Sequence, residues 1–157
     1  MTETNLADQV VFAENAYPAP IEKVWRAWTD PDRLKQWFGP KPGSLHSTEV
    51  DLREGGIWRF IFSGPGQPYA ALEGAYVEIE APSRLVFSWR HVSEDADGQR
   101  TATPDSTVAV TMQPTEGGTL VQVRHSNPKT TEGVTAGWKA CLGNLVSLLE
   151  AEALAPG

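Results

Sequence analysis

The last regular segment of the chain, residues 131–149, constrains the fold most strongly. Its apolar residues recur at steps of three and four, at Val134, Trp138, Cys141, Leu142, Leu145, Leu148 and Leu149. This spacing is the period of one apolar face on an α-helix. At about 1.5 Å per residue, such a helix is roughly 28 Å long, which is long enough to cover a whole sheet. We therefore expect the preceding residues to form a sheet that packs against this helix.

Residues 45–126 change to a period of two, with turn residues between the alternating runs. After a first strand at 9–16, we expect strands at 47–53, 57–63, 70–80, 84–92, 106–113 and 119–126. The intervening residues 93–105 are polar, and we expect them to form a long, mobile loop. Seven twisted antiparallel strands tend to curl. A long helix laid across a curled sheet can leave a cavity between the two layers.

Two short helices are expected directly after the first strand. Pro20 suits the first position of a helix, and Asp30 followed by Pro31 is a typical cap for a second one. Gly39 and Pro40 should end that second helix. The resulting element order, with strands in the middle and helices near both ends, predicts an α+β domain of two layers.

Composition narrows the range of partners and compartments. The 157 residues favour one domain over residues 9–157, with residues 1–8 as a polar tail. The formal charge of −7 argues against nucleic acid and anionic membranes as partners. No apolar run reaches the length of a membrane span, no signal peptide is evident, and the single cysteine, Cys141, cannot form an internal disulfide. We therefore expect a cytoplasmic protein, either a monomer or a homodimer.

Several stretches resemble a known family. These are PIEKVWRAWTDPDRLKQWFGP, VDLREGGIWRF, GAYVEIEAPSRLVFSW, and HSN followed by GWKACLGNLVSLL. They are similar to the bacterial relatives of the C-terminal domain of the Hsp90 ATPase activator, in the START-like or Bet v 1-like superfamily that also includes polyketide cyclases. The resemblance covers about residues 9–150. It implies a helix-grip fold, in which a seven-stranded curved antiparallel sheet wraps a long C-terminal helix around a pocket.

The aromatic residues are the main candidates for a ligand site, because apolar walls with a few polar groups are typical of small-molecule pockets. Trp58, Phe60 and Phe62 share one strand face by parity. The complete candidate set is Trp37, Phe38, Trp58, Phe60, Phe62, Glu73, Trp89, His125, Trp138 and Leu142. The competing interpretation is that each of these side chains simply fills the core.

Two members of the set are titratable. His125 follows Val121 and Val123 at a period of two, so it should face the helix, where it could bind a ligand, move a proton or serve as a structural histidine. Glu73 could point into the pocket or remain a surface carboxylate. The histidine and cysteine spacings indicate no zinc site, and no nucleophile or cofactor motif is present, so we expect no metal and no cofactor.

Three functions remain open. The first is binding of a small hydrophobic or aromatic ligand in the pocket. The second is an acid–base enzyme, such as a cyclase, hydratase or hydrolase, that uses His125 or an inward carboxylate. The third is a chaperone-associated interaction domain, which would need an exposed apolar patch.

Overall fold

The structure is a computed structural model that describes residues 10–39, 43–126 and 132–154. The expected tail at residues 1–8 lies outside this part of the chain. The described elements, in order, are β1 (Val10–Tyr17), α1 (Ile21–Thr29), α2 (Pro31–Trp37), β2 (Ser47–Val50), β3 (Ile57–Ile61), β4 (Ala70–Glu80), β5 (Arg84–Glu94), β6 (Arg100–Ala102), β7 (Ser106–Thr115), β8 (Gly118–Ser126) and α3 (Glu132–Leu154).

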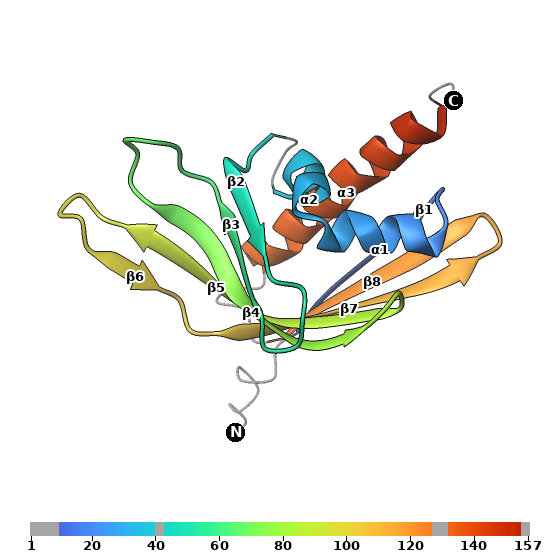
Figure 1. Ribbon diagram of the computed structural model, residues 1–157, viewed down its shortest axis with the longest axis horizontal. Coiled ribbons are helices and arrows are strands. Elements are labelled where there is room, and N and C mark those ends of the chain that lie inside the picture. Colours follow the sequence, from blue (N-terminus) through green and yellow to red (C-terminus); the bar gives the residue numbers. More distant parts are fainter. Residues whose placement is uncertain (1–9, 40–42, 127–131, 155–157) are drawn as a thin grey trace.

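The strands form one antiparallel sheet in the order β1-β8-β7-β5-β4-β3-β2, with β6 paired to β5 beside this path. The sheet curves beneath the helices, and α3 crosses the same side as α1 and α2 (Figure 1). This arrangement confirms the predicted α+β helix-grip fold. The path contains the seven strands expected, and β6 is an additional short strand among the described residues.

The additional strand corrects the prediction of a long loop at 93–105. Instead, β5 continues to Glu94 and returns as β6 through a tight turn. The Asp95 carboxylate accepts hydrogen bonds from the backbone N–H groups of Asp97 and Gln99, each over 2.9 Å. Gly98 has a φ of +82°, which favours glycine at this position. The polar sequence hid this short hairpin because its three strand residues are all exposed and show no alternation.

The glycine at position 74 makes room for the buried Trp58 side chain, which extends from β3 over β4 to β5. Gly74 on β4 lies opposite Trp58 on β3, and the Trp58 indole N–H donates to the carbonyl of Ser88 on β5 over 3.2 Å. A Cβ on Gly74 would collide with the Ser88 carbonyl and with the Trp58 indole. Beyond this point β4 has an irregular register between Tyr76 and Glu78, and such irregularities bend strands.

The two short helices pack their apolar faces toward the sheet. The Asp30 side chain caps α2 by accepting the backbone N–H of Asp32 over 2.9 Å. Trp37 is fully buried, and its indole N–H donates to the carbonyl of Ala27 in α1 over 2.9 Å. This hydrogen bond joins α1 to α2 and positions the residue that follows α2, Phe38, inside the fold.

The long helix α3 buries Trp138, Cys141, Leu142, Leu145 and Leu149, as the spacing predicts. At 23 residues it is roughly 34 Å long, and it continues five residues beyond the predicted end. Polar contacts with β1 and α2 help to fix the helix. The Tyr17 hydroxyl on β1 donates to the carbonyl of Leu142 over 3.3 Å, and Arg33 of α2 forms a two-point ion pair with Glu152.

Candidate functional site

A cavity lies between α3, the end of α2 and the concave face of the sheet, and it is partly open to solvent. Its volume is about 160 Å³, and the atoms that line it are almost all apolar. The lining residues are Phe38, Gly39, Phe62, Leu72, Trp89, Val134, Gly137, Trp138 and Cys141. This volume is large enough for a small organic molecule.

Each wall of the cavity follows from local structure. Leu72 on β4 and Trp89 on β5 point inward because alternate residues of a strand face the same side. Phe38 caps the C-terminus of α2 with an extended backbone, which turns its ring toward the sheet. Trp138 and Cys141 lie one helical turn apart on the buried face of α3.

The aromatic rings pack mostly edge-to-face or tilted. Phe38 lies centrally among them, with its ring centroid 4.8 Å from that of Phe60 and 6.0 Å from that of Trp138. The centroids of Trp89 and Trp138 are 5.4 Å apart. Such contacts favour fixed ring orientations, because the quadrupoles of aromatic rings prefer edge-to-face packing. The cavity therefore has walls of defined shape.

A chain of hydrogen bonds runs behind two of these walls. The Trp138 indole N–H donates to Nδ1 of His125 over 3.0 Å. An indole N–H can only donate, so Nδ1 accepts and the imidazole proton of neutral His125 lies on Nε2. Nε2 then donates to the Ser106 hydroxyl over 2.7 Å, and that hydroxyl donates to the carbonyl of Trp89 over 3.3 Å. The chain connects α3 with β8, β7 and β5.

The two titratable side chains nearest the cavity are both kept neutral. His125 is 1% exposed, and burial lowers its pKa to about 4. Both of its ring nitrogens already have partners. Burial also raises the pKa of the Cys141 thiol to about 12, so this thiol is not a nucleophile near neutral pH.

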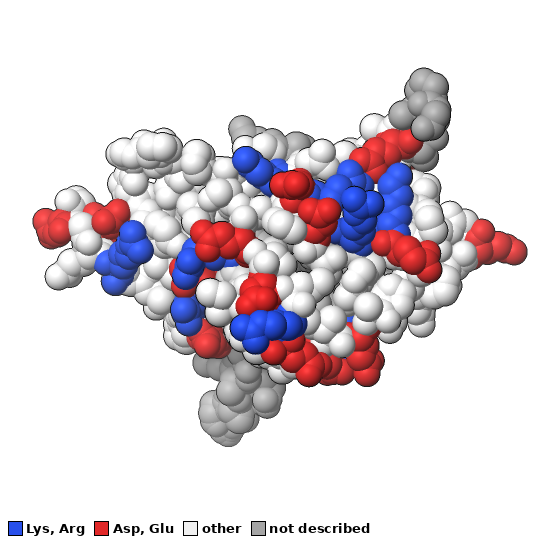
Figure 2. All heavy atoms as spheres, in the orientation of Figure 1, with Lys and Arg blue, Asp and Glu red and all other residues white. Residues whose placement is uncertain are grey.

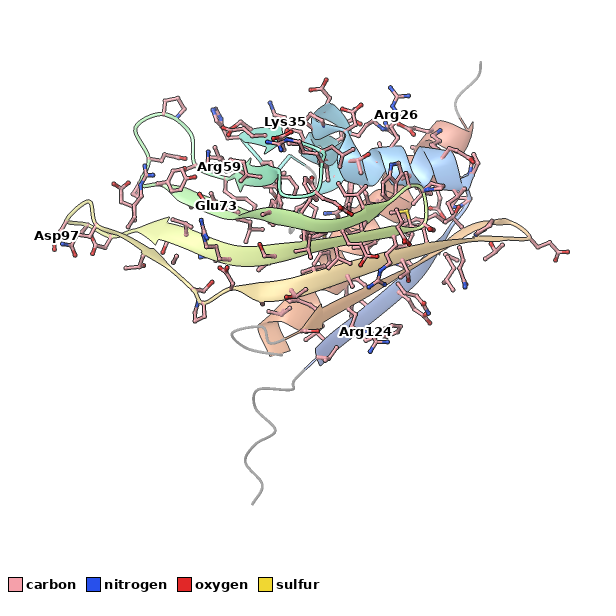
Figure 3. The ribbon with its side chains drawn as sticks, turned by 60° about the horizontal axis from the view of Figure 1, so that its bottom comes forward. Arg26, Lys35, Arg59, Glu73, Asp97 and Arg124 are labelled. Atoms are coloured by element: carbon pink, nitrogen blue, oxygen red, sulfur yellow. The ribbon has the colours of Figure 1, made fainter. Side chains whose placement is uncertain are left out.

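Glu73 does not line the cavity. Its side chain lies on the face of β4 opposite to that of Leu72. There it is placed between Arg59 of β3 and Arg90 of β5, which are its direct neighbours in the register. Its carboxylate accepts hydrogen bonds from both arginines and from the Tyr69 hydroxyl over 3.0–3.2 Å. Although partial burial opposes ionisation, these hydrogen bonds lower its pKa. Figure 3 shows Arg59 and Glu73 close together on neighbouring strands.

The structure thus brings some of the candidate residues to the cavity and separates others from it. Phe38, Phe62, Trp89 and Trp138 line the cavity. Trp37, Trp58, Phe60, His125 and Leu142 are buried in the core or behind the wall, and Glu73 is on the other face of the sheet.

Sequence reasoning missed Gly39, Leu72, Val134, Gly137 and Cys141 as lining residues. Val134 and Cys141 did carry a signal, because both belong to the predicted apolar face of the helix. The two glycines carried none, since a residue without a side chain contributes nothing to a hydrophobic pattern.

Other kinds of site find little support in the described residues. Within the ranges given above, no group of three or more His, Cys, Asp and Glu side chains is placed to hold a metal ion. None of the helices in this part of the chain combines the length and the apolar composition that crossing a membrane requires. On the face seen in Figure 2, basic and acidic side chains are interspersed instead of forming a basic stripe.

Solved structures similar to this one support the same architecture. An AHSA1-like protein from Aeromonas hydrophila is 28% identical, with a TM-score of 0.73 and coverage of 95% of this chain and 97% of that one. CalU16 from Micromonospora echinospora is 28% identical, with a TM-score of 0.65 and coverage of 94% and 80%. DynU16, a protein of the dynemicin biosynthetic locus, is 27% identical, with a TM-score of 0.72 and coverage of 91% and 48%.

No curated protein matches this chain. The family described as activator of Hsp90 ATPase homolog 1-like protein, by contrast, matches residues 18–150. That range runs from the end of β1 into α3 and includes every residue that lines the cavity. The chain belongs to the activator of Hsp90 ATPase homologue 1-like family.

Proposed function

We propose that this protein binds a small, neutral, apolar or aromatic molecule in the cavity between the curved sheet and α3. The observation that carries the proposal is the cavity itself, a space of about 160 Å³ with almost no polar atoms in its lining. Concave apolar sites with aromatic walls are the usual form of small-molecule sites in proteins.

The size and chemistry of the lining limit the ligand. An engineered apolar cavity of about 150 Å³ is large enough for benzene, so this cavity suits a compound with one aromatic ring or an aliphatic chain of similar size. A charged ligand is disfavoured, because no side chain that lines the described cavity is ionised near neutral pH. The ligand should therefore be neutral.

Acid–base catalysis is less well supported than binding. His125, the expected proton carrier, lies behind Trp138 instead of on the cavity surface, and both of its ring nitrogens are occupied. Glu73 is on the opposite face of the sheet, where two arginines neutralise it. A general base must reach the proton that it removes, and neither group is placed to do so.

The test is a calorimetric titration with toluene, a neutral single-ring compound. Wild-type protein should bind one equivalent with a dissociation constant of about 1 mM or lower. Gly137 lines the cavity and Gly143 lies further along α3, outside it. A Cβ added at either glycine meets no atom within 4 Å, so these positions form a matched pair.

Gly137→Leu should weaken toluene binding at least tenfold, because the new side chain extends from the cavity wall. Gly143→Leu should leave the affinity within twofold of wild type. Neither change should destabilise the helix, since leucine has a higher helix propensity than glycine. Absence of toluene binding by folded wild-type protein, or equal effects of the two variants, would contradict the proposal.

A further inference from the structure

Trp28 carries an unusual polar atom. Its side chain is 2% exposed, and its Nε1 is the only buried side-chain nitrogen or oxygen of the described residues that lacks a hydrogen-bond partner. The indole N–H groups of Trp37, Trp58 and Trp138, which are equally buried, all donate to nearby acceptors. A buried donor without an acceptor is destabilising and calls for an explanation.

Trp28 lines a second, inner cavity between the short helices and the sheet. This inner space has a volume of about 10 Å³, and its other walls include Trp58, Phe60 and Tyr76. Phe38 is the one residue that lines both the inner and the outer cavity. Its ring centroid lies 6.5 Å from that of Trp28 and 6.2 Å from that of Trp89. The Phe38 ring therefore lies between the outer cavity and the inner cavity that Trp28 lines.

The separation depends on the Phe38 side chain and not on its backbone. The Phe38 backbone N–H donates to the carbonyl of Leu34 over 2.9 Å. The next carbonyl, that of Gly39, accepts from the Asn144 side chain of α3 over 2.9 Å. These bonds hold the main chain on both sides of the ring. The ring itself makes only aromatic and apolar contacts, so admitting a ligand atom past it would cost ring packing but would break no hydrogen bond.

We propose that the ligand carries one neutral hydrogen-bond acceptor, a ketone, aldehyde or ester carbonyl, which passes Phe38 and accepts from Nε1 of Trp28. This inference rests on the proposed function and specifies its ligand class. The apolar part of the ligand occupies the outer cavity, where the walls offer it van der Waals contact. The carbonyl oxygen occupies the inner space, which has room for an atom or two but not for a ring.

A matched pair of ligands tests the proposal. 4-Phenyl-2-butanone and 2-methyl-4-phenyl-1-butene have the same shape, and only the ketone has an acceptor. With 15N-labelled wild-type protein, saturating ketone should shift the Trp28 indole N–H resonance downfield, whereas the alkene should not. The indole signals of Trp25 and Trp37, which line neither cavity, serve as internal references.

Affinities of the same pair in two variants provide the second measurement. Trp28→Phe removes the donor, and Trp25→Phe makes the same change on the same helix at a residue that lines neither cavity. The ratio of ketone affinity to alkene affinity should fall about tenfold in Trp28→Phe, because the ketone must then leave water without gaining a partner. The ratio should stay within twofold of wild type in Trp25→Phe.

Toluene distinguishes failure of this inference from failure of the proposed function. If toluene binds but the ketone leaves the Trp28 resonance unshifted, the outer site stands and the role of Trp28 is wrong. If neither toluene nor the ketone binds to folded protein, both proposals are overturned. The resonance shift is read in wild-type protein, so the inference remains testable even if Trp28→Phe does not fold.

Discussion

The indole N–H of Trp138 donates to Nδ1 of His125 over 3.0 Å, although 13 residues separate them in the chain. The bond joins the buried face of α3 to the end of β8, directly behind the cavity wall that Trp138 forms. It also fixes the tautomer of His125, and through Ser106 it extends to the backbone of β5. The position of this wall thus depends on a hydrogen bond as well as on packing.

Replacing Trp138 with phenylalanine keeps an aromatic ring but removes the donor. We expect Trp138→Phe to lower the free energy of unfolding by about 1–3 kcal/mol, because Nδ1 of His125 is left buried and unpaired. The pKa of His125 should rise, since the donated hydrogen bond favours the neutral ring. Urea denaturation and NMR titration of the imidazole measure the two effects. An unchanged unfolding midpoint together with an unchanged His125 pKa would show that the bond contributes nothing.

The lowered pKa of His125 predicts a dependence of stability on pH. The pKa is about 4 in the folded protein and 6.5 in an unperturbed histidine. As the pH falls below 6.5, the unfolded chain takes up a proton that the folded protein excludes, so stability decreases until the pH reaches about 4. The total loss should be about 3 kcal/mol.

The matched control for this pH dependence is His125→Gln, which should remove the decrease between pH 6.5 and pH 4 while leaving any loss at lower pH. Hydrogen bonds from Arg33 and Lys23 lower the pKa of Glu152 from 4.5 to about 2, so the loss of stability from this carboxylate begins near pH 4.5 and falls mostly below that window. Urea midpoints of the two proteins at half-unit pH steps make the comparison. Parallel curves for wild type and His125→Gln would contradict the assignment to His125.

A substitution at Gly74 tests the packing of the Trp58 side chain over β4. An alanine Cβ at this position would collide with the Ser88 carbonyl, which is backbone and cannot move aside. We expect Gly74→Ala to destabilise the protein by about 2–4 kcal/mol, at or above the upper end for overpacked sites. Gly117→Ala is the control, because a Cβ there meets no atom within 4 Å. Equal unfolding midpoints for the two variants would show that β4 and β5 do not approach as described.

The fold could be predicted from the sequence because apolar residues alternate clearly in the strands and recur at helical spacing in α3. Strand parity placed Trp58, Phe60 and His125 inward, and helical spacing placed Trp138 and Cys141 on the buried face of α3. The same parity argument also separates Glu73 from its neighbour Leu72, and the arginines opposite Glu73 in the register explain its outward position. Those partners lie 14 and 17 residues away, so the pattern within one strand could not reveal them.

The cavity was harder to predict than the core. Whether a buried aromatic residue fills space or borders it depends on packing between elements, and Trp37 and Phe38 illustrate this. The two are adjacent in the sequence and both are almost fully buried, but Trp37 donates to Ala27 within the core whereas Phe38 lines the cavity. The hydrogen bonds of His125 could not be predicted from the sequence either, because they depend on the register of β7 with β8 and on the rotation of α3 about its axis.

The most direct test of the account is to locate bound toluene by intermolecular nuclear Overhauser effects in isotope-labelled protein. We predict contacts from the toluene methyl group to the Leu72 methyl groups, the Phe62 ring and the Trp138 indole, all of which line the cavity. Exposed apolar side chains elsewhere, such as Ile57 and Val77, should show none. Contacts confined to Ile57 and Val77, or no contacts at saturating toluene, would contradict the claim that the space between the sheet and α3 is a binding site.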